Sequence, residues 1–278
     1  MVGVHRSHER PKVGYGVVSR IGPVKQPFSP KTYAALGAAE DRHFWFRARS
    51  DAIAAAVYRC VRQFPAGYTV LEVGCGTGGV LHRIESVCVE GKVSGVELEA
   101  SGAEASRLRC NCEVVTGSID DLDQERRFNL VAAFDVIEHV ADDVALLASM
   151  ASRIVEGGRV LLTVPAHPSL FSYWDVASGH YRRYSKSGLN AAIEAAGLHA
   201  EWMTPVFAAL VPFAWARTRR RVARDVSADD VMEVDLRLPG RWANAAGYSA
   251  LAWETFFIRH RLRVPFGSSY LVVATRGH

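Results

Sequence analysis

A run of glycines after an apolar segment is the clearest chemical signal in the sequence. Gly74, Gly76 and Gly78 follow a β-rich run that ends at the β-branched Val73, and helix-forming residues resume after Gly79. Glycine tolerates positive φ and lets a ligand approach the backbone where a side chain would collide. The segment predicts a strand, a ligand-binding turn and a helix at the carboxyl edge of a parallel sheet. The alternative is a tight turn with only a structural role.

A carboxylate ends the next β-rich run. Glu97 closes residues 92–97, and a carboxylate there can accept hydrogen bonds from both hydroxyls of a ribose. The alternative is an acidic residue at a helix start, stabilised by the helix dipole. The glycine spacing lacks the Gly-x-Gly-x-x-Gly pattern of dinucleotide enzymes and the Lys-Ser/Thr ending of a P-loop, which disfavours an NAD-dependent dehydrogenase.

Three ionisable residues follow the apolar run 128–134. They are Asp135, Glu138 and His139, and we expect them at the same sheet edge. An imidazole, with an unperturbed pKa of ~6.5, suits proton removal near neutrality, so His139 is the first candidate for a general base. The alternative is that His139 only packs and hydrogen-bonds beside the bound ligand.

Aromatic, imidazole and guanidinium groups are dense in residues 164–185, after the fifth expected strand. Such a segment suits a lid over a polar or anionic acceptor, and its histidines are further candidates for the base. Equally, the two arginines could pair with a local carboxylate and hold the loop. The residues concerned are His167, Trp174, His180, Arg182, Arg183 and Tyr184.

The helix before the first strand carries Phe44, Trp45 and Phe46 in succession, and a regular helix cannot turn all three toward one core. We expect at least one of them to face the pocket or a partner, with Trp45 and Arg47 as the candidate substrate contacts.

Short β-rich runs alternate with helical segments, which predicts βαβ units and a parallel sheet. A helical signal over residues 31–62 precedes them, and residues 207–267 form a long insertion with two helical portions. The expected strands are 68–73, 92–97, 112–116, 128–134, 159–165, 199–206 and 269–275, and the expected helices between them are 78–87, 101–109, 142–155 and 190–196.

The order Glu-x-Gly-x-Gly-x-Gly from Glu72, together with Phe-Asp-Val-Ile-Glu-His-Val from Phe134, resembles the class I S-adenosylmethionine-dependent methyltransferases over roughly residues 40–200 and the last strand. The His180 segment resembles Gly-His-x-Arg-Arg-Tyr of bacterial methyltransferases in glycan and natural-product pathways. The resemblance implies a Rossmann-like α/β sheet of seven strands in the order 3-2-1-4-5-7-6, with the last strand antiparallel.

The resemblance also implies the cofactor, S-adenosyl-L-methionine, with S-adenosyl-L-homocysteine as its product. Members usually have Asp where Ser118 stands, so a hydroxyl would replace a carboxylate there. Asp135, Glu138 and His139 resemble the metal-binding Glu-x-x-Glu-His of ubiquinone-type O-methyltransferases, but we expect no metal. The implied cofactor-binding residues are Glu72, Gly74, Cys75, Gly76, Gly78, Glu97, Leu98, Ser118, Ile119, Phe134 and Asp135.

Composition sets the remaining expectations. A net charge of +4 names no nucleic-acid partner, and five cysteines without a Cys-x-x-Cys pair suggest reduced thiols in a cytoplasmic protein. Cys110 and Cys112 lack a second pair that would complete a metal site. No apolar stretch reaches the ~20 residues of a membrane span.

The expected organisation is a flexible arm (1–30), a methyltransferase domain (31–206 and 268–278) and the helical insertion (207–267). For the insertion, a substrate cap, a homodimer face and a peripheral membrane element, the last suggested by the arginines at 217–221, stay open. The predicted activity is methylation of a small-molecule acceptor in a biosynthetic pathway, first of all on oxygen. The alternatives are N- or C-methylation and a non-catalytic nucleotide-binding subunit.

Overall fold

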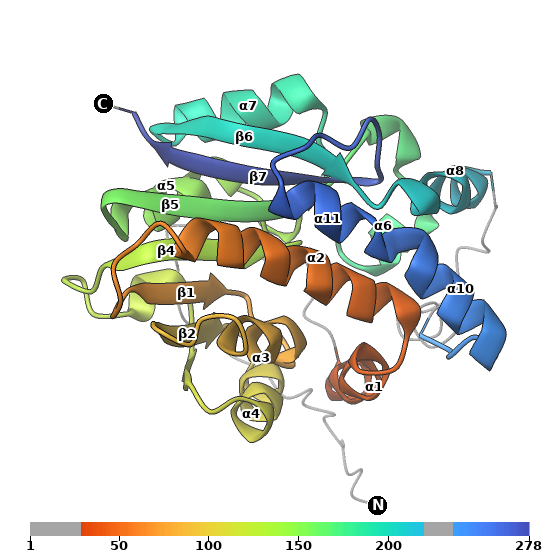
Figure 1. Cartoon of the computed structure of the whole chain (residues 1–278), viewed down its shortest axis with the longest axis horizontal. Coiled ribbons are helices and arrows are strands. Elements are labelled where there is room, and N and C mark those ends of the chain that lie inside the picture. The colour runs from red at the N-terminus through yellow and green to blue at the C-terminus, as the bar shows by residue number, and fades with distance from the viewer. Residues whose placement is uncertain (1–28, 220–235, 278) are drawn as a thin grey trace, which may run out of the picture.

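Seven strands form one sheet in the order β3-β2-β1-β4-β5-β7-β6 (Figure 1). The structure is a computed structural model, and it describes residues 29–219 and 236–277. The first five strands pair in parallel, whereas β7 runs antiparallel to both β5 and β6. The predicted order and the antiparallel last strand are therefore confirmed. The strands are β1 (Thr69–Val73), β2 (Lys92–Glu97), β3 (Glu113–Thr116), β4 (Phe128–Phe134), β5 (Ile154–Pro165), β6 (Leu198–Val206) and β7 (Ser269–Arg276).

Helices cover both faces of the sheet. On one face, Leu147 of α5 and Ile193 of α7 join Val131 of β4 in a buried cluster. On the other face, α2, α3 and α11 pack against Leu130. Alternate residues of β4 thus serve opposite faces, as the two-residue period of a strand requires. The helices are α1 (Pro30–Glu40), α2 (Phe44–Val61), α3 (Gly79–Glu85), α4 (Ala100–Arg109), α5 (Asp143–Ser152), α6 (Tyr173–Ala177), α7 (Lys186–Ala195), α8 (Val211–Thr218), α10 (Arg241–Ala252) and α11 (Glu254–Arg259).

Two local predictions were wrong. The expected continuous helix over 31–62 is two helices, because His43 adopts an extended conformation and its ring accepts a hydrogen bond from the Trp45 amide, which starts α2 anew. Helix α5 ends at Ser152 instead of near residue 155, since Ile154 already pairs with Phe128 as the beginning of β5. Caps and strand pairing thus override the local helical pattern.

The insertion between β6 and β7 packs on the sheet domain. Its described part holds three helices, α8, α10 and α11, and not the two portions expected. Helices α10 and α11 run beside α2 (Figure 1), with Leu251 and Ile258 buried in the core of that face. The Asn244 side chain accepts from the Phe44 amide and donates to the Arg42 carbonyl, both at 2.8 Å, and so caps α2.

Some expectations fall outside the described residues, namely the N-terminal arm up to residue 28 and the arginines at 220–221 of the basic cluster. Among the helices that are described, none combines the length and apolarity needed to cross a bilayer.

Glu254 anchors the insertion, and its removal provides the first test. Its fully buried carboxylate accepts from the amides of Phe207 and Ala208 where the chain leaves β6, and Phe207 has a positive φ of 64°. Glu254→Ala leaves two buried N–H groups without a partner, so we expect the free energy of unfolding to fall by about 2–3 kcal/mol. Urea denaturation measures it. The exposed control Glu194→Ala should change it by less than about 0.5 kcal/mol, and an equal loss in both variants would contradict the anchoring role.

Candidate functional site

The glycine turn after β1 has the backbone that its sequence predicts. Gly74, Gly76 and Gly78 all have positive φ, at 71°, 55° and 80°. A Cβ on Gly74 would lie 2.8 Å from Val136, whereas a Cβ on Gly76 would meet nothing within 4 Å. Gly74 is therefore required by packing, and Gly76 leaves its backbone open to a ligand.

Glu97 binds this turn from the end of β2. Its Oε2 accepts from the Gly76 amide at 2.8 Å, and its Oε1 accepts from the Glu99 amide at 3.0 Å. Tyr33 of α1 donates its hydroxyl to Oε1 at 3.4 Å. Burial raises the pKa of Glu97, and the hydrogen bonds from Glu99, Gly76 and Tyr33 oppose that shift. A buried carboxylate thus lies beside the open backbone, where a ribose would need an acceptor.

Helix α1 covers the turn with residues that the sequence analysis missed. Thr77 donates to the Glu40 carboxylate at 2.6 Å, and Arg109 forms an ion pair with it. The same carboxylate lies against Gly79, where a Cβ would clash. The only available signal was the position of a helix before the first strand, because these partners are 37 to 69 residues apart.

The buried side chain of Glu72 indicates whether a ligand fits beside the glycine turn. It is 2% exposed, its Oε2 has no hydrogen-bond partner among the described residues, and burial raises its pKa well above the usual range. Buried polar atoms are nearly always paired, so an orphaned oxygen under a glycine turn fits a ligand or water as its missing partner. The residues at this edge suit S-adenosylmethionine.

The other predicted cofactor residues line the same edge in different ways. Leu98 is 49% exposed and Cys75 is buried beneath the turn. The hydroxyl of Ser118 bonds Asp121 and caps a 3₁₀ turn, in which Ile119 is fully buried in the core. Ile119 can therefore offer a ligand its backbone but not its side chain.

Asp135 and Phe134, at the end of β4, are held by an arginine from α2. Arg49 donates to Asp135 Oδ2 at 2.7 Å and to the Phe134 carbonyl at 2.9 Å. Asp135 has a positive φ of 57°, which is uncommon for a residue other than glycine and clusters at functional sites. Asp135 is thus paired with an arginine, and it does not join Glu138 and His139 in a ligand set.

The group that does come together is Glu138, His139 and His180, whose potential ligand atoms lie within 4.8 Å of one another. Glu138 is fully buried, and neither of its oxygens has a hydrogen-bond partner among the described residues. The rings of His139 and His180 meet edge to face at 4.6 Å. Burial, followed by the neighbouring His180, lowers the pKa of His139 to about 3. That value makes His139 a much weaker base than the sequence predicts.

Asp175, fully buried in α6, organises the predicted lid. Its Oδ1 lies 2.9 Å from His180 Nδ1 and accepts from Arg183 Nε at 2.7 Å, while its Oδ2 accepts from the Ser172 amide at 2.8 Å. An imidazole whose Nδ1 faces a buried carboxylate is fixed in orientation. The sequence placed Asp175 in the segment without assigning it this role.

Arg182, Arg183 and Tyr184 all have local partners. Arg182 pairs with Asp143 at 2.6 Å, and the buried Tyr184 hydroxyl donates to the same carboxylate at 2.6 Å. Arg183 pairs with Asp175 in the same way. Both arginines therefore bind local carboxylates and hold the loop, which is the alternative that the sequence left open. Their direct contact with an acceptor stays a prediction.

Trp174, Trp45 and Arg47 each contact the insertion. The ring centroids of Trp174 and His180 are 5.6 Å apart in an edge-to-face arrangement, and the Arg217 guanidinium of α8 lies 5.6 Å from the Trp174 ring centroid. The ring centroids of Trp45 and Phe207 are 4.6 Å apart, and the Arg47 guanidinium lies 4.5 Å from the Tyr248 ring centroid.

His167, in contrast, is held at the start of the lid. Its Nε2 lies 3.1 Å from the Gly267 carbonyl oxygen, and its backbone has a positive φ of 61°. This contact fixes the loop after β5 to the end of the insertion.

Residues 45–201 match the sequence profile of a methyltransferase domain family. The chain belongs to this family. Together with its similarity to ubiquinone O-methyltransferases, the match identifies it as a class I S-adenosylmethionine-dependent methyltransferase.

Two curated relatives illustrate the range of similarity. The ubiquinone biosynthesis O-methyltransferase of Xanthomonas axonopodis pv. citri is 31% identical over 140 residues, 47% of this chain and 57% of that protein. The ribosomal protein L11 methyltransferase of Burkholderia mallei is 34% identical over 101 residues, 35% of this chain and 32% of that protein. The chain thus matches between about a third and somewhat over half of the length of these relatives.

Two solved structures share the fold. A chain from the complex of the Haloferax volcanii Trm112 methyltransferase activator with a methyltransferase superposes with a TM-score of 0.58 at 19% identity, over 91% of this chain and 100% of that one. A methyltransferase from Bacillus halodurans C-125 reaches 0.50 at 17% identity, over 79% of this chain and 97% of that one.

The open backbone at Gly76 can be tested against a matched glycine. Gly76 and Gly157 both have positive φ and open space at the Cβ position, but only Gly76 lies at the proposed cofactor site. We expect Gly76→Val and Gly157→Val to lose similar stability, about 1–2 kcal/mol, and only Gly76→Val to lose binding of S-adenosylhomocysteine in calorimetry. Glu97→Ala should weaken binding by about 1–3 kcal/mol. Unchanged affinity in Gly76→Val and Glu97→Ala would refute the assignment.

The low pKa of His139 predicts a pH dependence of stability. Between pH ~6.5, the unfolded-state value, and about 3, the unfolded chain binds a proton at His139 that the folded protein does not. Burial of His139 therefore leaves the free energy of unfolding undiminished above pH ~6.5, and it lowers that free energy progressively as the pH falls below this value. His139→Gln removes this titration, so the free energy of unfolding should rise less steeply with pH over that range. The change in slope should correspond to at most one bound proton, and urea denaturation at several pH values measures it. An unchanged slope would show that His139 titrates normally.

Proposed function

We propose that the protein transfers a methyl group from S-adenosylmethionine to an oxygen of a small-molecule acceptor. The observation that carries this proposal is the buried His180–Asp175 pair beside His139. N- or C-methylation on the same fold is the alternative. The similarity to ubiquinone O-methyltransferases supports the choice of oxygen, whereas the ribosomal protein L11 methyltransferases are the relatives to weigh against it.

The cofactor supplies an electrophilic methyl group on a sulfonium. The protein's part is then to align the acceptor, exclude water and remove one proton. We assign Gly74, Gly76 and Gly78 to the close approach of the backbone, and Glu97 to the ribose. Glu72 and the residues around the end of β4 complete this side of the site.

His180 receives the proton in this proposal. As the acceptor oxygen takes the methyl group, its proton passes to the imidazole, and Asp175 stabilises the imidazolium across 2.9 Å. His139, kept neutral by its low pKa, accepts a hydrogen bond and positions the acceptor. His167 is the weaker candidate, because its Nε2 lies against the Gly267 carbonyl.

Acceptor recognition falls to the aromatic side of the lid. Trp174 is only half-buried and lies between His180 and Arg217 of the insertion. Since Arg182 and Arg183 are already paired with carboxylates, a planar, apolar acceptor with a hydroxyl group suits the site better than a multiply charged one.

Substitutions at the two histidines separate the base from the positioning residue. A screen of phenolic and other hydroxyl acceptors, scored by release of S-adenosylhomocysteine, first identifies a substrate. We then expect His180→Gln and Asp175→Asn to lower kcat by ~10²–10⁴-fold, and His139→Gln to retain most of it.

Cofactor binding should survive in all three variants, and the exposed control His199→Gln should be fully active. The opposite pattern, with His139→Gln inactive and His180→Gln active, would return the base to His139. Normal turnover in both would remove the histidine pair from the chemistry.

A further inference from the structure

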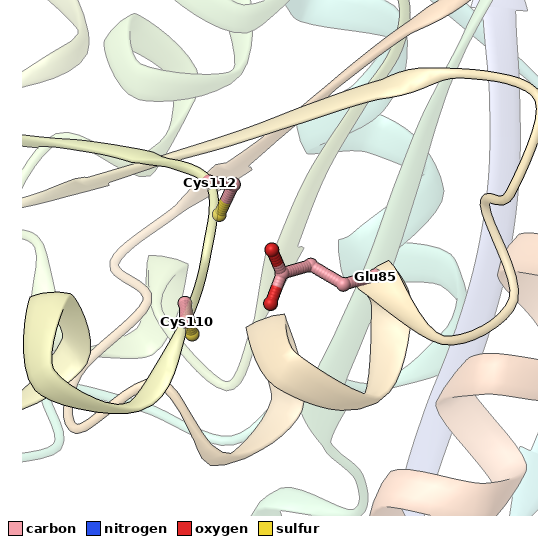
Figure 2. A group of neighbouring side chains, drawn as sticks. All are labelled: Glu85, Cys110 and Cys112. Atoms are coloured by element: carbon pink, nitrogen blue, oxygen red, sulfur yellow. The ribbon is translucent and has the colours of Figure 1, made fainter.

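A second group of potential ligands lies away from the acceptor side, where α4 leads into β3. Cys110 directly follows α4, Cys112 directly precedes β3, and Glu85 is the last residue of α3. The carboxylate of Glu85 points toward the loop that carries both cysteines (Figure 2). One ligand atom from each residue lies within 4.8 Å of the other two.

These donors match the preferences of zinc. Two thiolates and a carboxylate are common zinc ligands, with Zn–S near 2.3 Å and Zn–O near 2.0–2.2 Å, so ligand atoms around a tetrahedral ion stand roughly 3.5–3.8 Å apart. Small side-chain rotations would bring the three atoms to that separation. A hard ion such as Mg²⁺ would not select two sulfurs.

The surroundings hold the carboxylate in place and offer a fourth ligand. The Asn111 amide, between the two cysteines, donates to both Glu85 oxygens at 3.0 and 3.3 Å. His82, one turn earlier on α3, has its Nδ1 3.6 Å from Glu85 Oε2, and its side chain is 56% exposed. It is therefore free to rotate toward an ion held by the other three.

An entry path is present as well. Glu85, Asn111 and Cys112 line an open cavity of about 670 Å³ that extends to Lys92 and Arg126. Cys112 is half-buried and Cys110 is buried, so an ion could enter from the cavity and be enclosed on the side of Cys110.

We propose that Glu85, Cys110 and Cys112 form a binding site for a zinc ion, with His82 within reach of the fourth position. All five cysteines of the chain are free thiols in this structure. A Cys110–Cys112 disulfide is the competing use of the two sulfurs. The carboxylate favours the metal, because it would contribute nothing to a disulfide.

The ion would be structural, and it would act next to the glycine turn. The Cys110 thiol donates to the Gly78 carbonyl oxygen at 3.5 Å, so the cysteine lies between the proposed ion site and the last glycine of the turn. A zinc-bound thiolate has no proton to donate, so metal binding would replace this hydrogen bond. Bound zinc would tie the loop between α4 and β3 to α3, which Gly78 caps. The proposal is independent of the acceptor chemistry.

Metal titration of the full-length, untagged, reduced protein tests the site. Competition with a chromophoric chelator should give one tight zinc equivalent, and cobalt should give a near-ultraviolet thiolate-to-metal charge-transfer band. Cys112→Ser and Glu85→Gln should each weaken zinc binding by at least the roughly 10–100-fold that loss of a ligand's hydrogen-bond partner costs, and reduce the band. Cys60→Ala, which removes a buried thiol of the core, should bind zinc as the natural chain does.

Thermal unfolding without metal serves as the folding control. Each variant should unfold cooperatively, and added zinc should raise the Tm of the natural chain and of Cys60→Ala more than that of Cys112→Ser and Glu85→Gln. Equal zinc affinity in all variants would assign the ion to an adventitious site elsewhere and overturn the proposal. Absence of uptake by the reduced protein, or isolation of a stable Cys110–Cys112 disulfide that reduction does not convert to a metal-binding form, would overturn it too.

Discussion

The carboxylate of Glu97 joins the ends of two neighbouring strands, and the proposed cofactor site is built around it. One oxygen accepts the Gly76 amide from the turn after β1, and the other accepts the Glu99 amide at the start of α4. Tyr33 adds α1 to the same carboxylate. These bonds add to those of the Gly74 and Cys75 amides with the Val96 carbonyl and of Thr77 with Glu40, and together they hold a turn with three positive φ angles.

Asp175 plays the same part on the acceptor side. It accepts from a backbone amide and from Arg183, and it faces His180, so one buried charge fixes residues 172–183 against each other. Asp143 does the same for Arg182 and Tyr184. Burial alone would raise the pKa of Asp175, but the hydrogen bond with His180 and the charge of Arg183 hold it below its usual value. The Arg182–Asp143 pair joins the lid to α5, whereas the Arg183–Asp175 pair holds the lid together internally.

The sequence predicts the strands well and the partners of the polar residues poorly, for a physical reason. Strand boundaries such as 92–97 and 128–134 follow from short apolar runs between turn residues, which are local properties. The Arg49–Asp135 pair joins residues 86 positions apart. The low pKa of His139 depends on burial and on His180. Cys110 and Cys112 seemed incomplete as a metal site because Glu85 lies 25 residues earlier and reaches them only once α3 packs beside α4.

The insertion contacts both halves of the site. Asn244 caps α2, which carries Arg49 to Asp135, and Phe207 packs on Trp45 of the same helix. On the acceptor side, Arg217 faces Trp174, which rests on His180. These inward contacts support the cap among the three roles that the sequence leaves open. We infer that the insertion serves as a cap, and that differences in acceptor among similar chains would arise there, since the lid's arginines are already bound to Asp143 and Asp175.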